Sequence, residues 1–152
     1  MRRKDRERDR EFGISVIDEC EYGTVAIQAD EPYCLPLSLV RIGNDLYFHC
    51  ALEGKKLELL RGNNAVWVSF VGENKAAQDD FTTYFRSAMV KGTAEEVTDD
   101  GEKVAALRAL CEKLTPGHMP AFDSEVARSF AVTDIWKIHI DEITAKEKLR
   151  KQ

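Results

Sequence analysis

The stretch 46–60, LYFHCALEGKKLELL, constrains the fold most, because the spacing of its apolar residues changes at a glycine. Residues 46–51 alternate, which predicts a strand with two faces: Leu46, Phe48 and Cys50 on one, Tyr47, His49 and Ala51 on the other. From Gly54 the spacing becomes helical, and a helix of about two turns is expected to begin near Glu53 or Gly54. The stretch therefore predicts a strand, a tight turn and a short helix in direct succession.

Lys55 and Lys56 stand in the first turn of this predicted helix. Free N–H groups already make a helix N-terminus partly positive, so each cation there costs about 0.3–1 kcal/mol. A bound anion would remove the conflict, because amides, ammonium groups and a glycine that permits close approach together suit a phosphate. The alternative is that both lysines are solvated surface charges. Together with the strand, His49 and Gly54, the pair favours a phosphate site.

The remaining segments predict an order typical of a small antiparallel barrel. Alternating or apolar runs predict strands, and apolar residues at helical spacing predict helices. The expected order is a helix at 12–21, strands at 22–29, 33–41 and 46–51, a helix at 54–60, strands at 65–71 and 81–97, a helix at 100–115, a loop with a short helix at 118–130, and a strand at 133–143. This order indicates the α+β class, with a barrel of six strands and flanking helices.

Three local signals refine this barrel. Pro36 interrupts the strand 33–41, which predicts an edge or a bulge and leaves backbone groups open to a ligand; a simple edge proline is the alternative. The turn at 43–45 predicts a hairpin that brings 36–38 into the same sheet as His49. Residues 72–80 predict a polar loop, and Gly92 predicts a bulge that bends the long strand.

Composition limits the class of protein. The chain has 152 residues, 43% hydrophobic and 32% charged, with a formal charge of −5. This length predicts one domain, and the negative charge argues against a general nucleic-acid binder. No apolar run approaches the ~20 residues that cross a bilayer, and the N-terminus shows no apolar signal region. We therefore expect a cytoplasmic protein without membrane association.

The two ends of the chain are rich in charge. Residues 2–11, RRKDRERDRE, are charged at every position and predict a solvated helix extension or frayed tail; the interleaved acids weaken the alternative, a nucleic-acid arm. The expected organisation is an N-terminal extension at 1–11, one domain at 12–145 and a charged tail at 146–152. The four cysteines form no CxxC pair, so neither a metal site nor a disulfide framework is expected.

The hairpin PYCLPLSLVR…GNDLYFHCALEGKKLELLRGNNAVWVSF, followed by YFRSAMVKGTAEEV, resembles the pyridoxamine 5′-phosphate oxidase-like superfamily of FMN-binding split barrels. Within that superfamily the sequence looks closest to the nitroimidazole-resistance (Nim) type. The resemblance covers about residues 12–145, and YFHxAxxGKK is its most specific part. It implies a six-stranded antiparallel split β-barrel that binds FMN, and a homodimer with a flavin in each of two interface grooves.

The resemblance also implies roles for particular residues. The FMN phosphate is expected at Gly54, Lys55 and Lys56. Other contacts are expected from His49 and Cys50 before the turn, from the backbone of Leu37 and Ser38, and from Ser87 on the long strand with Arg86 beside it. Trp136, on the last strand, is expected to contribute from the partner subunit.

These roles imply an FMN-dependent oxidoreductase acting on a small electron acceptor, in which the flavin carries the chemistry. In Nim-type proteins a histidine at the flavin edge is associated with nitroimidazole reduction, a role that falls to His49 here; a hydrogen-bonded site residue without proton transfer is the alternative. The C-terminus lacks the tryptophan and arginine motif of vitamin B6 oxidases, which argues against B6 metabolism. Two other functions stay open: a flavin-binding or storage module without turnover, and a heme-binding split barrel with His49 as axial ligand.

Overall fold

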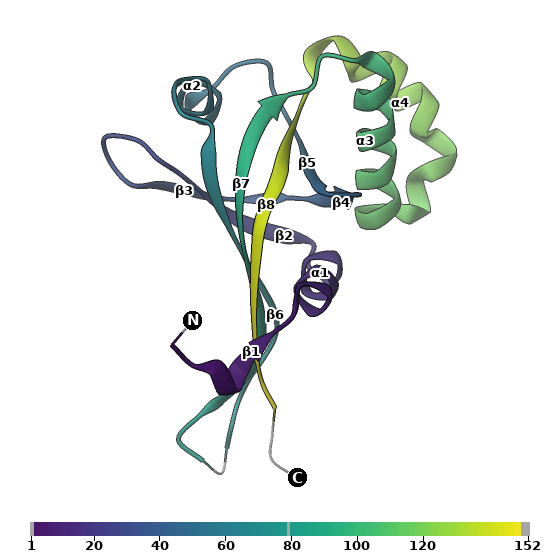
Figure 1. Cartoon of the computed structure of the whole chain (residues 1–152). Helices are drawn as coiled ribbons and strands as arrows, with labels where there is room; N and C mark the ends of the chain where they lie inside the picture. The colour runs from purple at the N-terminus through teal and green to yellow at the C-terminus, as the bar shows by residue number, and fades with distance from the viewer. Residues whose placement is uncertain (1, 79, 150–152) are drawn as a thin grey trace.

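The computed structural model describes residues 2–78 and 80–149, and its centre is one curled antiparallel sheet (Figure 1). The strands are β1 (Glu7–Arg8), β2 (Tyr22–Ile27), β3 (Tyr33–Ser38), β4 (Val40–Ile42), β5 (Asp45–Cys50), β6 (Ala65–Ala76), β7 (Thr83–Glu96) and β8 (Asp134–Lys148). The helices are α1 (Arg10–Glu19), α2 (Lys55–Gly62), α3 (Asp100–Leu114) and α4 (Phe122–Ser129), with short 3₁₀ turns at Lys4–Arg6, Pro116–Ala121 and Phe130–Val132. None of these described helices is long and apolar enough to cross a bilayer.

The sheet closes on itself through a single residue, Leu39. Its strand order is β3-β2-β6-β7-β8-β5-β4, so β3 and β4 stand at opposite edges although only Leu39 separates them in the chain. Before Leu39, the chain forms β3, which pairs with β2; β3 nevertheless contacts β5. No ladder joins β3 to β5 in the described residues. This opening, between residues 33–38 of β3 and 48–50 of β5, is named the seam below.

The α+β split barrel is confirmed, but the sheet has eight strands where six were expected. The predicted strand 33–41 divides at Leu39, because its two halves pair with different neighbours. The other addition is β1, in which Glu7 and Arg8 of the charged run pair with Lys146 and Ala145 of β8. The side chain of Arg8 also forms an ion pair with Glu147.

Several expected boundaries also move. Strand β8 continues to Lys148, into the segment expected as a tail, and β6 runs to Ala76 with a bulge between Val71 and Asn74, where a loop was expected. Residues 1, 79 and 150–152 lie outside the described part. The register shifts at Gly92, as expected, but the extra residue is on β8: Lys91 pairs with Glu142 and Gly92 with Ile140, so Asp141 is left without a partner on β7.

The sheet buries apolar residues on both faces, which explains the alternation in β5. Leu46, Phe48 and Cys50 lie in the large cluster inside the barrel. Tyr47 lies on the opposite face, in a second cluster beneath α3 that also contains Val40, Val97, Ala106, Leu110 and Ile135. Figure 1 shows α3 and α4 together on one side of the sheet and α2 at the end of β5. The two clusters fix β5, and with it the position of His49.

Candidate functional site

The start of α2 has the features expected of an anion site. Gly54 precedes it with φ 143° and ψ 163°, and no side chain caps the helix. The Gly54 carbonyl accepts hydrogen bonds from the amides of Leu57 (2.9 Å) and Glu58 (3.2 Å). The amides of Lys55 and Lys56 are then the first-turn donors that have no carbonyl within the helix. In the described part of the chain neither lysine forms a salt bridge.

The seam brings together the residues expected from the second strand and from β5. Val40 pairs with Tyr47, and Arg41 with Leu46. If this register continued past Leu39, Ser38 would stand opposite His49 and Leu37 opposite Cys50. Instead, Ser38 and Leu37 pair with Tyr22 and Gly23 of β2. The second edge of β3 thus faces β5 without a ladder, and its backbone groups are available to a ligand.

Side chains at the seam divide into exposed and buried ones. Ser38 and His49 are exposed, whereas Leu37 packs against the barrel core and Cys50 belongs to it. Burial raises the pKa of the Cys50 thiol to about 11, although the nearby Lys56 ammonium opposes this shift. Leu37 and Cys50 therefore offer main-chain groups, while Ser38 and His49 also offer side chains.

Arg86 is occupied by α1 rather than by the seam. Its guanidinium donates to Glu19 Oε2 (2.7 Å) and to Ser15 Oγ (3.2 Å), and its Cζ lies 4.9 Å from the centre of the Phe12 ring. These contacts dock α1 onto β7. We therefore leave Arg86 out of the candidate site. Ser87, the next residue, points to the opposite face of β7, and β2 and β6 lie between β7 and β3.

Trp136, which was expected to contribute from the partner subunit, is a core residue of its own chain. It is 3% exposed, and its Nε1 donates to Asp134 Oδ2 at 3.0 Å. The buried Asp134 carboxylate also pairs with Lys103 at 3.4 Å. Within its own chain, the Trp136 ring is therefore buried and its Nε1 already has a hydrogen-bond partner.

A feature that sequence reasoning missed is an exposed apolar surface on the outward side of the sheet, formed by Tyr22, Trp67, Val71 and Met89 and named the outer face below. The pairing of Thr24 with Ser69, and of Val71 with Ser87, places Tyr22, Val71 and Ser87 in one row across β2, β6 and β7. The signal was the nearly continuous apolar run AVWVSFV, which is typical of a strand covered on both sides.

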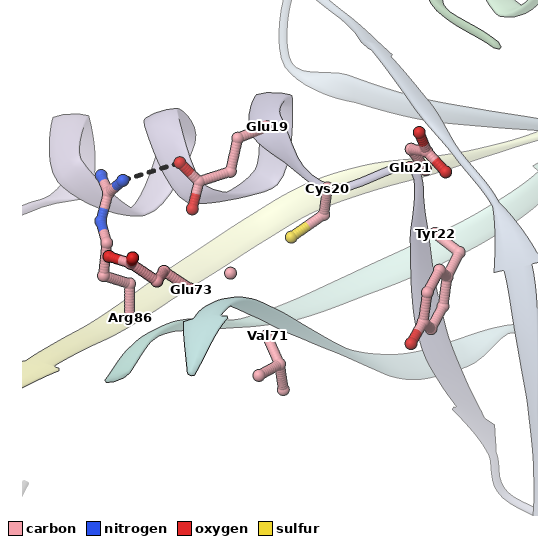
Figure 2. Close-up of a pocket in the computed structure, with 8 residues that line it drawn as sticks. Glu19, Cys20, Glu21, Tyr22, Val71, Glu73 and Arg86 are labelled. Carbon is pink, nitrogen blue, oxygen red and sulfur yellow. Dashed lines mark hydrogen bonds and ion pairs between the residues drawn. The ribbon is translucent and has the colours of Figure 1, made fainter. Parts of the chain in front are cut away.

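A groove of about 570 Å³ continues the outer face toward α1. Figure 2 shows Tyr22 and Val71 pointing the same way beside it, and the Glu19–Arg86 ion pair at its other end. Its remaining lining residues are Cys20, Glu21, Gly72 and Glu73. Two of its carboxylates are neutralised, Glu19 by Arg86 and Glu73 by Lys75. The groove is thus open and mostly charge-balanced.

A family model described as pyridoxamine 5′-phosphate oxidase matches residues 9–147, a range that includes the seam, the start of α2 and the outer face. The chain belongs to the pyridoxamine 5′-phosphate oxidase family. This family includes oxidoreductases. A search of curated proteins gives no match.

Solved structures agree with membership of the pyridoxamine 5′-phosphate oxidase family. A candidate 5-nitroimidazole antibiotic resistance protein from Bacteroides thetaiotaomicron is 27% identical, with 91% of this chain and 84% of that one covered and a TM-score of 0.74. The flavocytochrome Anf3 from Azotobacter vinelandii (23% identity, 99% and 72% covered, TM-score 0.78) has the same fold. So does the FAD and heme binding protein from Mycobacterium smegmatis (24% identity, 95% and 74% covered, TM-score 0.78).

Proposed function

We propose that this member of the pyridoxamine 5′-phosphate oxidase family binds FMN at the seam and acts as an FMN-dependent oxidoreductase on small acceptors of the nitroaromatic class. The observation that carries the proposal is the pair Lys55 and Lys56 at an uncapped helix start, with no salt bridge to the described chain. Two cations and two free amides at one helix start fit a phosphate. Gly54 adds no side chain that would keep a phosphate away from these amides.

Each part of the site has its own task in this proposal. Lys55 and Lys56 bind the phosphate through their amides and ammonium groups, and the free edge of β3 at Leu37 and Ser38 offers backbone groups to the polar edge of the ring. FMN, when bound, supplies hydride and electron transfer. The exposed imidazole of His49 orients the acceptor and gives it a proton from a ring nitrogen.

The outer face supports a homodimer. Tyr22 and Val71 are 61% and 59% exposed, and they continue into Trp67 and Met89 on the neighbouring positions of the same surface. An apolar sheet face of this kind is stabilised by burial, and a second copy of the chain offers a self-complementary partner. Ser87 lies in the row of Tyr22 and Val71, so in such a dimer it lies at the interface between the two copies.

The nitroaromatic class rests on the similarity to the nitroimidazole-resistance candidate. Two other functions are separated by simple measurements. A heme-binding barrel with His49 as axial ligand is favoured by the exposure of His49 and by the heme-binding solved structure of the same fold. The visible spectrum of the purified protein distinguishes flavin from heme. A flavin-storage module would bind FMN but would not be reduced by NAD(P)H and reoxidised by a nitroimidazole in stopped-flow mixing.

The double variant Lys55→Ala, Lys56→Ala tests the phosphate assignment. We expect it to purify without flavin and to melt within a few degrees of the flavin-free wild type, because Lys55 is exposed and the contact of Lys56 with the Phe48 ring is worth only about 0.5–1 kcal/mol. The matched variant Lys55→Arg, Lys56→Arg keeps both charges and should retain flavin. A double alanine variant that carries a full complement of FMN would show that the phosphate binds elsewhere.

His49→Ala tests the catalytic assignment separately. The variant should bind FMN as tightly as the wild type but transfer electrons to a nitroimidazole more slowly, by about 10²–10⁴-fold if His49 is the proton donor. Unchanged transfer with full flavin occupancy would assign the proton to solvent or to another group. Loss of the fold would instead make His49 a packing residue.

A further inference from the structure

Lys113, near the end of α3, holds two main-chain carbonyls from distant parts of the chain. Its Nζ donates to the carbonyl oxygen of Cys20 at 2.6 Å and to that of Leu39 at 3.0 Å. Burial lowers the pKa of Lys113, while the carboxylates of Asp18 and Glu21 act in the opposite direction. The ammonium is therefore partly buried against carbonyl dipoles, and its nearest polar contacts are backbone atoms.

Both carbonyls belong to residues outside the ladders. Cys20 ends α1 just before β2, and Leu39 is the junction at which β3 becomes β4. Leu39 is fully buried, and a buried carbonyl without a donor costs about 1–3 kcal/mol. The two carbonyls flank one strand pair, since Tyr22 after Cys20 pairs with Ser38 before Leu39. A single ammonium thus fixes the paired ends of β2 and β3, beside the junction at which β3 leaves the seam and becomes β4.

We propose that Lys113 is a positioning residue of the seam: by holding Leu39 it sets where the free edge of β3, at Leu37 and Ser38, stands relative to β5. The part of this inference that concerns FMN rests on the proposed function. The part that concerns the backbone does not, because it is visible in the protein without flavin. The two parts can therefore fail separately.

The test replaces Lys113 by methionine, which keeps the aliphatic stem but cannot donate. We expect faster hydrogen exchange of the amides at 37–40 in flavin-free Lys113→Met, and a dissociation constant for FMN about ten-fold higher than that of the wild type. Lys113→Arg keeps a donor, so its hydrogen exchange at 37–40 and its FMN affinity should be close to those of the wild type. If Lys113→Met does not fold, Lys113→Gln takes its place: its uncharged amide donor is one bond closer to the helix, so smaller changes in the same direction are expected in exchange and in FMN affinity.

Lys137→Met is the matched control. Lys137 pairs with Glu102 of α3 at 2.9 Å and with Glu95 at 3.0 Å, so it anchors the other end of the same helix without contacting the seam. The Lys137→Met variant should melt at a lower temperature than the wild type, but its hydrogen exchange at 37–40 and its FMN affinity should be unchanged. Three results would overturn the proposal. The first is wild-type hydrogen exchange at 37–40 in Lys113→Met, and the second is faster exchange in this variant with wild-type FMN affinity. The third is that Lys137→Met changes exchange and FMN affinity as much as Lys113→Met does. A wild type that binds no FMN refutes the proposed function, and exchange then decides on Lys113 alone.

Discussion

The ammonium of Lys56 lies 5.4 Å from the centre of the Phe48 ring, at the end of β5 where α2 begins. Lys55 is exposed by comparison, so the two lysines are not equivalent. A cation already held over an aromatic ring loses less side-chain freedom when it binds an anion. Lys56→Ala should therefore weaken FMN binding more than Lys55→Ala, by about ten-fold.

Calorimetric titration of the flavin-free protein with FMN measures this difference. Arg128→Ala is the control, because Arg128 is an exposed cation on α4 that pairs with Glu125. Equal losses in the two lysine variants would contradict a special role for the Phe48 contact.

The two glycines at the ends of α2 should respond oppositely to alanine. Gly54 has φ 143° and ψ 163°, a conformation that costs a non-glycine residue about 1–3 kcal/mol. Gly62 lies in the last turn with no atom within 4 Å of an added Cβ, so Gly62→Ala should be neutral or stabilising by about 0.5–1 kcal/mol. Urea denaturation of both variants gives the comparison. A Gly54→Ala protein as stable as the wild type would show that the α2 start rearranges freely.

The outer face should be required for dimerisation. Val71→Asp places a charge at the centre of this face, and we expect the variant to sediment as a monomer in analytical ultracentrifugation. Val132→Asp is the control, since Val132 is 66% exposed but lies next to α4, away from the outer face. A wild type that is itself monomeric, or a Val71→Asp dimer, would remove the outer face as the interface.

The cysteines should differ in reactivity toward a thiol reagent. Cys34 is exposed on β3, whereas burial raises the pKa of Cys20 and raises that of Cys50 to about 11. The thiolate is the reactive form, so at mildly alkaline pH Cys34 should react fastest, Cys20, which lines the groove, more slowly, and Cys50 only on unfolding. The fast phase should vanish in Cys34→Ser. A fast phase that survives this substitution would place the reactive thiol elsewhere.

Glu102 should make the protein sensitive to acid. Hydrogen bonds from Lys137 and Tyr47 hold the pKa of Glu102 below its ordinary value of 4.5. A group with a lowered folded pKa stabilises the fold above the ordinary value, and this contribution is lost as pH falls through the folded pKa. The free energy of unfolding should thus fall less steeply below about pH 4.5 in Glu102→Gln than in the wild type. The contribution is modest because the Glu102 side chain is about one third exposed.

The sequence predicts the strand and helix around Gly54 well because each has its own period. Residues 46–51 alternate, and Leu57 and Leu60 recur at helical spacing. By contrast, β1 was missed because Glu7 and Arg8 carry no apolar pattern and form a strand only through their pairing with β8. The division at Leu39 was missed as well, because the pattern runs on through it and only the tertiary pairing of each half reveals the break.

The candidate site was predictable where its parts are local. Lys55 and Lys56 follow from the helix start, and the turn at Gly43 places 36–38 in the same sheet as His49. The alternation in the last strand correctly predicts that Trp136 points inward, but it does not show whether an inward residue reaches a ligand. Lys113 was invisible to pattern reading, because a lysine on an amphipathic helix is typical of a solvated face and its two carbonyl partners lie far away in sequence.

Because Leu39 joins β3 to β4, the two walls of the seam are mechanically coupled: one is the free half of a bent strand, and the other is the partner of its paired half. Torsion at this junction therefore moves one wall of the gap relative to the other. A ligand in the gap therefore acts on this junction, and through it on both the β2–β3 and the β4–β5 hairpin.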